Sequence, residues 1–160
     1  MTKDKLEKYY SNYGKITWVE ENKKMDADIY VFDCDIKTIL PDEEVLISID
    51  SVPFVIVTRE KQGKTVIFCF KIASKDSFLG DSALEILNSV NKDMVYGKFT
   101  VDNDGDIDWE YTYESERAEE ENIKDYLKSC LLGIMDIVIL SLEEEQKKEQ
   151  KSERSAENKK

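Results

Sequence analysis

The stretch Tyr96–Tyr113 constrains the fold more than any other part of this sequence, because apolar and polar residues alternate on both sides of one turn signal, Asn103–Gly105. A two-residue turn there would place Val101 opposite Asp108 and would mix apolar and charged side chains on one face. A three-residue turn keeps the faces separate and puts Gly105 at the left-handed position that such turns require. We therefore predict an antiparallel hairpin in which Val101 pairs with Ile107, Phe99 with Trp109, Gly97 with Tyr111, and Lys98 with Glu110.

Two earlier runs, Phe54–Val57 and Val66–Phe70, are apolar at every position. Strands of this kind are typical of the middle of a sheet that is covered on each side. A polar turn at Arg59–Lys64 separates the two runs. Weaker alternation predicts further strands at Ile16–Trp18, Tyr30–Ile36 and Val45–Ile49.

Helical spacing of apolar residues marks three more segments. The first is a short N-terminal helix that ends near Gly14 and carries Leu6, Tyr9, Tyr10 and Tyr13. The second covers Asp81–Asn91, with Asp81 as its N-cap. The last helix should begin near Arg117 and extend past Leu142, with one apolar stripe made of Ile123, Tyr126, Leu127, Cys130, Leu131, Ile134 and Val138.

From Cys130 to Leu142 this last helix is apolar almost all round. A helix that lies on one face of a small sheet cannot bury all of that surface, so we expect part of it to contact a partner. Four apolar residues lie outside the main stripe and are the predicted partner-binding or dimer interface: Leu132, Met135, Ile139 and Leu142. The alternative is a helix enclosed in the core between other elements.

The C-terminal segment 143–160 contains one apolar residue, Ala156, among six acidic and six basic side chains. It cannot bury enough surface to offset the entropy of ordering, which predicts a charged helix end that runs into a disordered tail. Residues 1–142, which contain no internal repeat or flexible linker, are then a single α+β domain. Because the charges of the tail cancel, the formal charge of −12 belongs to that domain.

This charge disfavours nucleic acid as a partner, because affinity for phosphate backbones depends on Lys and Arg. The sequence contains no histidine, which removes the usual general base near neutral pH and the commonest metal ligand. Gly63–Thr65 resembles the end of a phosphate-binding loop, but Thr58 stands where its first glycine belongs. We therefore predict no catalytic residue, no cofactor and no metal site.

Two acidic features are candidates for an ion-binding or functional site. The turn Asp102–Asp108 is rich in carboxylates, but Thr100 and Tyr111 occupy the end positions of a calcium-binding loop, so a solvated turn is favoured over a weak ion site. Asp136 stands alone among apolar residues, and helical spacing puts it on a solvated side or a rim.

Three cysteines stand in apolar surroundings, which predicts buried, unreactive thiols at Cys34, Cys69 and Cys130. The sequence shows no signal-peptide core and no apolar run long enough to span a membrane. We expect a cytoplasmic protein without a membrane partner.

The C-terminal part of the chain, from Asp81 to about Leu142, resembles the YbjN family of proposed bacterial sensory transduction regulators. The resemblance rests on Ser89–Asn91, Tyr96–Asp102, Asn103–Asp106 and Leu131–Asp136. It implies an α+β fold like that of type III secretion chaperones, with a curved antiparallel sheet, helices packed on it, a long C-terminal helix and frequent dimerisation. It supplies no catalytic residues.

These observations favour a non-enzymatic, chaperone-like protein-binding or regulatory module that acts as a homodimer and binds a segment of another protein. One alternative is a small-molecule or lipid-binding sensor, with a pocket lined by Phe54, Phe68, Phe70, Trp109 and Tyr111. Another is a metal-dependent enzyme built on converging carboxylates.

Overall fold

The computed structural model describes residues 2–42, 50–74 and 82–157, and its fold is α+β, as predicted. All six strands belong to one open antiparallel sheet, in the order β1-β2-β3-β4-β6-β5. The strands are β1 (Gly14–Asn22), β2 (Ala27–Asp35), β3 (Ser51–Arg59), β4 (Lys64–Ser74), β5 (Lys98–Val101) and β6 (Asp106–Glu114). The helices are α1 (Lys3–Tyr10), α2 (Ile36–Ile39), η1 (Glu60–Gln62), α3 (Ala83–Asp93) and α4 (Glu120–Glu157).

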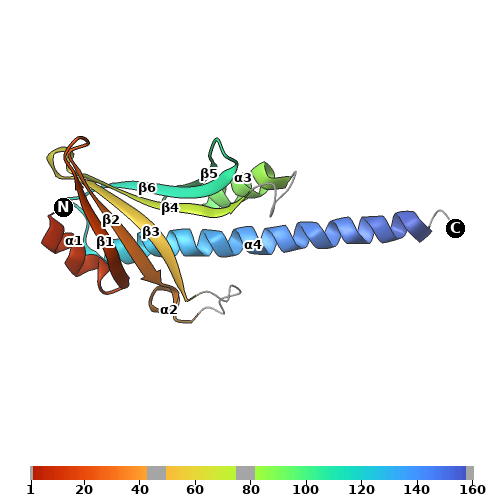
Figure 1. Cartoon of the computed structure of the whole chain (residues 1–160). Coiled ribbons are helices and arrows are strands. Elements are labelled where there is room, and N and C mark those ends of the chain that lie inside the picture. The colour runs from red at the N-terminus through yellow and green to blue at the C-terminus, as the bar shows by residue number, and fades with distance from the viewer. Residues whose placement is uncertain (1, 43–49, 75–81, 158–160) are drawn as a thin grey trace.

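The sheet is twisted, and the long helix α4 runs along one of its faces (Figure 1). The core fills the space between this face and the helices. Within this core, the hydroxyl groups of Tyr10 in α1 and Tyr113 in β6 form a hydrogen bond, with their oxygens 3.2 Å apart. Phe54 of β3 packs edge to face on Trp109 of β6. The largest side chains that are fully buried are Trp109, Tyr10, Tyr30, Phe32, Phe54, Leu6, Ile39, Ile56, Ile67, Ile107, Ile123 and Leu127.

The predicted hairpin is confirmed in its register. The backbone N–H of Asp102 donates to the carbonyl of Asp106 at 2.9 Å and closes a three-residue turn, in which Gly105 has a φ of 84°. Gly97 precedes the first residue of β5, so its predicted pairing lies just outside the strand. The paired residues are Lys98 with Glu110, Phe99 with Trp109, Thr100 with Asp108, and Val101 with Ile107.

A short N-terminal helix is present as α1, which is capped by Thr2. It ends at Tyr10 and not near Gly14 as predicted, so Tyr13 lies in the turn that precedes β1. The strand expected over Tyr30–Ile36 ends one residue early. The Asp35 carboxylate accepts hydrogen bonds from the backbone N–H groups of Lys37 and Thr38, so Ile36 begins α2 instead. The strand expected at Val45–Ile49 and the N-cap expected at Asp81 lie outside the described residues.

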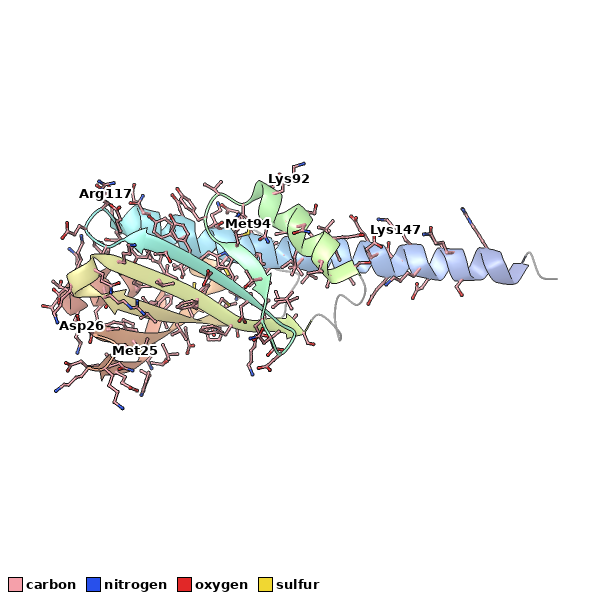
Figure 2. All side chains as sticks on the ribbon, turned by 90° about the horizontal axis from the view of Figure 1, so that it is seen from above. Met25, Asp26, Lys92, Met94, Arg117 and Lys147 are labelled. Carbon is pink, nitrogen blue, oxygen red and sulfur yellow. The ribbon has the colours of Figure 1, made fainter. Side chains whose placement is uncertain are left out.

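Helix α4 begins at Glu120, close to the predicted start, and it extends past Leu142. The charged helix end predicted after Leu142 is long, because the helix continues to Glu157. The disordered tail expected beyond the helix end stays a prediction. The C-terminal part of α4 extends beyond the end of the sheet, and Lys147 lies on this projecting part (Figure 2). There Lys147 pairs with Glu144 at 2.9 Å, one of the local ion pairs that support exposed helices.

Candidate functional site

The two central strands, β3 and β4, carry apolar side chains on both faces of the sheet. On the face toward α4, Phe54, Ile56 and Ile67 have no exposed surface. On the other face, Val55 and Phe68 are partly exposed. The central position of these strands was predicted correctly, but their cover on each side was not, because within the described residues the helices pack on one face only.

The strand register arranges the outward-facing residues in rows across the sheet. Trp18 of β1 pairs with Val31 of β2, which pairs with Val55 of β3, which pairs with Phe68 of β4. The neighbouring row joins Ile29, Val57 and Val66. Together with Phe70, these side chains form a continuous apolar surface that we call the open-face patch: Trp18, Ile29, Val31, Val55, Val57, Val66, Phe68 and Phe70.

Trp18 reaches this face because of an irregularity in the edge strand. Ile16 pairs with the core residue Phe32, so simple alternation would also turn Trp18 toward the core. The register shifts by one residue at Thr17, and Trp18 pairs with Val31 instead. The indole is 47% exposed. A bulge has therefore moved the largest side chain of β1 onto the open face.

Phe70 shows the same exposure at the other side of the patch. It is 47% exposed, and its ring stacks on that of Phe68 with centroids 5.1 Å apart and an angle of 13° between the planes. Two stacked phenylalanines and a tryptophan are large amounts of apolar surface to leave in water. Aromatic residues of this kind are enriched in the centres of protein interfaces.

The charges around the patch largely compensate one another. Three bases stand directly opposite acids on the neighbouring strand: Lys15 opposite Asp33, Lys64 opposite Glu114, and Lys98 opposite Glu110. Glu20, opposite Ile29, and Arg59, opposite Lys64, add one charge of each sign. Asp106, which pairs with Lys71, and Asp108, opposite Thr100, lie on the same face as Glu110. The margin of the open face therefore keeps a small negative excess, in a chain whose formal charge is −12.

The four residues predicted as an interface on α4 do not form one exposed surface. Leu132 and Met135 are partly buried and pack against the core. Ile139 is 38% exposed and Leu142 is 50% exposed, near the point where the helix leaves the sheet. The structure therefore leaves only Ile139 and Leu142 of this set largely available to a partner.

Leu132 also lines a hollow of about 300 Å³ between α3 and α4. Its walls carry Asp93, Asp125 and Asp136, with Lys128 as the basic residue of the lining. Asp136 is exposed, in agreement with the predicted rim position, and partial burial followed by the charge of Asp93 raises the pKa of its carboxyl group. This side of α4 is acidic.

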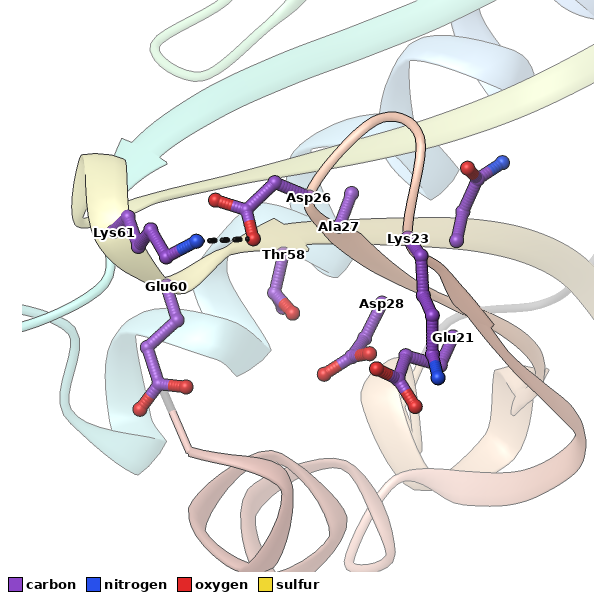
Figure 3. Close-up of a pocket in the computed structure, with 9 residues that line it drawn as sticks. Glu21, Lys23, Asp26, Ala27, Asp28, Thr58, Glu60 and Lys61 are labelled. Carbon is purple, nitrogen blue, oxygen red and sulfur yellow. Dashed lines mark hydrogen bonds and ion pairs between the residues drawn. The ribbon is translucent and has the colours of Figure 1, made fainter.

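A second hollow, of about 250 Å³, lies between the β1–β2 turn and η1 (Figure 3). Lys61 reaches across and pairs with the Asp26 carboxylate at 2.8 Å. Both side chains are exposed, so this ion pair contributes little to stability. Glu21, Asp28 and Glu60 also line the hollow, but the described residues contain no group of three or more His, Cys, Asp or Glu side chains arranged to hold a metal ion.

The carboxylate-rich turn at Asp102–Asp108 uses its acids to hold its own backbone. Oδ1 of Asp102 accepts hydrogen bonds from the N–H groups of Asp104 and Asp106 at 2.8 and 2.9 Å. Asp106 also pairs with Lys71 at 3.6 Å. These contacts are those of a turn stabilised by side-chain capping.

The three cysteines are free and buried, as predicted. Burial and then the charge of Asp35 raise the pKa of Cys34 to about 12. Burial, followed by a hydrogen bond with Cys69, raises the pKa of Cys130 well above its ordinary value. Thiols in this state carry no thiolate at neutral pH and are poor nucleophiles.

The aromatic residues considered as a ligand pocket divide between the two faces. Phe54 and Trp109 are fully buried beneath the sheet, whereas Phe68 and Phe70 lie on the open face. Tyr111 packs instead against Tyr126 of α4, with the two ring centroids 4.7 Å apart. The five aromatic residues therefore do not surround one cavity.

No protein-family model, curated protein or solved structure matches this chain. The resemblance to the YbjN family therefore stays a prediction from the residues. Within the described ranges, none of the helices is long and apolar enough to pass through a bilayer.

Proposed function

We propose that this chain is a protein-binding module and that another polypeptide covers the open-face patch. The observation that carries the proposal is the row Trp18, Val31, Val55 and Phe68, which is apolar across four strands and stays partly exposed. Covering such a surface is favourable by about 25 cal/mol for each Å² of apolar area removed from water.

The proposal retains the chaperone-like role that the type III secretion chaperone resemblance implies, that of a non-enzymatic protein that holds a partner. It moves the main contact from α4 to the sheet, because Leu132 and Met135 are partly used by the core. The lack of histidine in the sequence supports a binding role over a hydrolytic one. Three free thiols support a reducing, cytoplasmic location.

Site-specific photo-crosslinking in the cell of origin tests this function directly. A photoreactive phenylalanine analogue replaces Val66, which lies inside the patch, and a matched variant carries it at Gln150, on the projecting part of α4. Covalent adducts with a polypeptide are expected from position 66 and not from position 150. The adducts are then identified by mass spectrometry.

A third variant with the analogue at Ile139 tests the interface that the sequence predicts on α4. Adducts from position 139 without adducts from position 66 would contradict the proposed function of the sheet. Adducts from neither position, in a chain that expresses and folds normally, would contradict protein binding by both surfaces.

A further inference from the structure

We infer that the polypeptide on the open-face patch is a second copy of this chain, so that two sheets pack face to face with their helices outside. The inference rests on the proposed function and names its partner. Three observations carry it: the dimensions of the face, the charges at its margin and the position of the helices.

The open-face patch is the apolar centre of a contact whose full size includes its polar margin. Strands lie about 4.8 Å apart and alternate residues along a strand about 6.7 Å apart, so the four strands and three rows of the patch span about 19 Å by about 20 Å. This apolar area of about 400 Å² is half of the roughly 800 Å² per partner of standard interfaces, in which a little more than half of the area is apolar, and the margin with Lys15, Lys64 and Lys98 widens the contact. Two facing sheets also form the two-layer packing in which inner side chains interdigitate.

The charge distribution favours this face for contact between identical chains. Two copies of a chain with a formal charge of −12 repel each other at most orientations. At the open face, Lys15, Lys64 and Lys98 each stand opposite an acid of their own chain, and Lys71 pairs with Asp106. Most of the charge there is compensated, with Asp108 as an added acid, so contact through this face brings together a small part of the total negative charge.

The solvent side of α4 is a poorer site for self-association. A symmetric contact there places the acidic hollow of one copy, with Asp93, Asp125 and Asp136, against that of the other. Like charges that face each other across an interface oppose association. The partly exposed Ile139 and Leu142 offer less apolar area in return than the eight residues of the open-face patch.

The helices leave the open face accessible. Helices α1, α3 and α4 lie against the other side of the sheet, and the projecting part of α4 continues beyond the end of the sheet without crossing to the open face (Figures 1 and 2). A second sheet can therefore approach without displacement of a described element.

The two tryptophans make the contact visible in solution. Trp109 has no exposed surface, whereas Trp18 is 47% exposed in one chain and lies in the patch. Quenching of fluorescence by acrylamide therefore reports mainly on Trp18. Association through the open face should protect this indole as protein concentration rises.

The experiment measures molar mass by chromatography with light scattering, together with acrylamide quenching, from low micromolar to near-millimolar full-length chain. We expect twice the mass of the chain and protection of Trp18 in step with the mass. Phe68→Asp and Val57→Asp each bury a carboxylate in the contact and should weaken association at least about a hundredfold. Leu142→Asp is the matched control on α4 and should leave the mass unchanged.

Circular dichroism and the urea midpoint establish that each variant is folded, and two patch variants guard against one that misfolds. A monomeric wild-type chain overturns the inference, as does a dimer that Leu142→Asp dissociates and the patch variants do not. The wild-type chain could be monomeric while a chain with the photoreactive analogue at position 66 still crosslinks to a different protein in cells. That result would overturn the identity of the partner and leave the proposed function intact. Protection of Trp18 from acrylamide at all concentrations in a monomeric chain would contradict both the second copy as partner and the proposed function of the open-face patch.

Discussion

The two faces of the sheet are built from the same strands and both carry large apolar side chains on β3 and β4, yet they differ in what covers them. Phe54 and Val55 are consecutive in β3, and only Phe54 is fully buried. The core face is closed by α1, α3 and α4, whereas the open face keeps Trp18 and Phe70 about half exposed. The comparison shows that an apolar strand face predicts that its side chains will be buried. It does not predict whether the same chain or another molecule packs on them.

The largest expected difference between the faces is in the free energy of unfolding after loss of a phenylalanine. Phe54→Ala leaves a cavity beside Trp109 and should destabilise the fold by about 3 to 5 kcal/mol. Phe68→Ala, on the neighbouring strand and the opposite face, should cost less than about 1.5 kcal/mol. Urea unfolding at low protein concentration, where association contributes little, measures both values.

Equal losses for the two variants would break the comparison, because they would show that the open face is packed as tightly as the core. A larger loss for Phe68→Ala that grows with protein concentration would instead indicate stabilisation by a second chain. The pair of variants therefore separates cover within the chain from cover by a partner.

Alkaline pH should loosen the core face selectively. Burial raises the pKa of Tyr30 and Tyr113 to about 12, from an ordinary value of 10.0. Their neutral forms favour the folded state, so this stability is fully present below pH 10 and is lost as pH rises from 10 to 12. For the deeply buried Tyr113 the loss amounts to about 2 to 3 kcal/mol at most.

The measurement is the urea midpoint as a function of pH, with tyrosinate absorbance recorded alongside. Tyr113→Phe should flatten the decline above pH 10, whereas Trp18→Phe on the open face should leave it unchanged. Tyrosines that ionise early in the folded chain, at the ordinary value, would contradict the described burial of Tyr113.

A smaller effect is expected from a buried polar pair near one end of the core face. The hydroxyls of Thr65 and Ser115 are fully buried and lie 2.8 Å apart. Ser115→Ala removes this hydrogen bond and should destabilise the fold by about 1 kcal/mol. Thr65→Val removes the other hydroxyl and provides the second arm of a double-mutant cycle. If the losses in the free energy of unfolding from the two single variants add fully in the double variant, the two hydroxyls are not coupled.

The sequence predicts one of the two faces better than the other for physical reasons. The register of the β5–β6 hairpin follows from local information, namely the position of Gly105 and the alternation around it. Trp18 could not be assigned to a face, because the bulge at Thr17 reverses the alternation and nothing in the adjacent residues marks it. The apolar runs of β3 and β4 did contain the signal for the open face, since Val55 and Phe68 call for a cover that the helices of the described residues do not provide.

The interface predicted on α4 shows a similar limit. Helical spacing correctly placed Leu132, Met135, Ile139 and Leu142 outside the main stripe, but the depth to which the core partly encloses the first two depends on how the other elements pack against α4. Long-range packing of this kind has no local signature. A charged helix end was predicted for the segment after Leu142, but its extent to Glu157 was not, because local pairs such as Glu144 with Lys147 support an exposed helix without any apolar pattern.

The smallest expected effect concerns a charged pair on the open face, Lys98 opposite Glu110. Lys98→Ala should change the free energy of unfolding by less than about 0.5 kcal/mol, because exposed cross-strand pairs contribute little to folding. It leaves Glu110 uncompensated beside Phe68, however, and two such faces brought together repel each other. Association of the variant should therefore become more favourable with added salt, which screens that repulsion, whereas the wild-type dimer should respond weakly. A loss of folding stability near 2 kcal/mol would show that Lys98 supports the sheet itself, and an identical salt response in both proteins would remove the charge argument for pairing through this face.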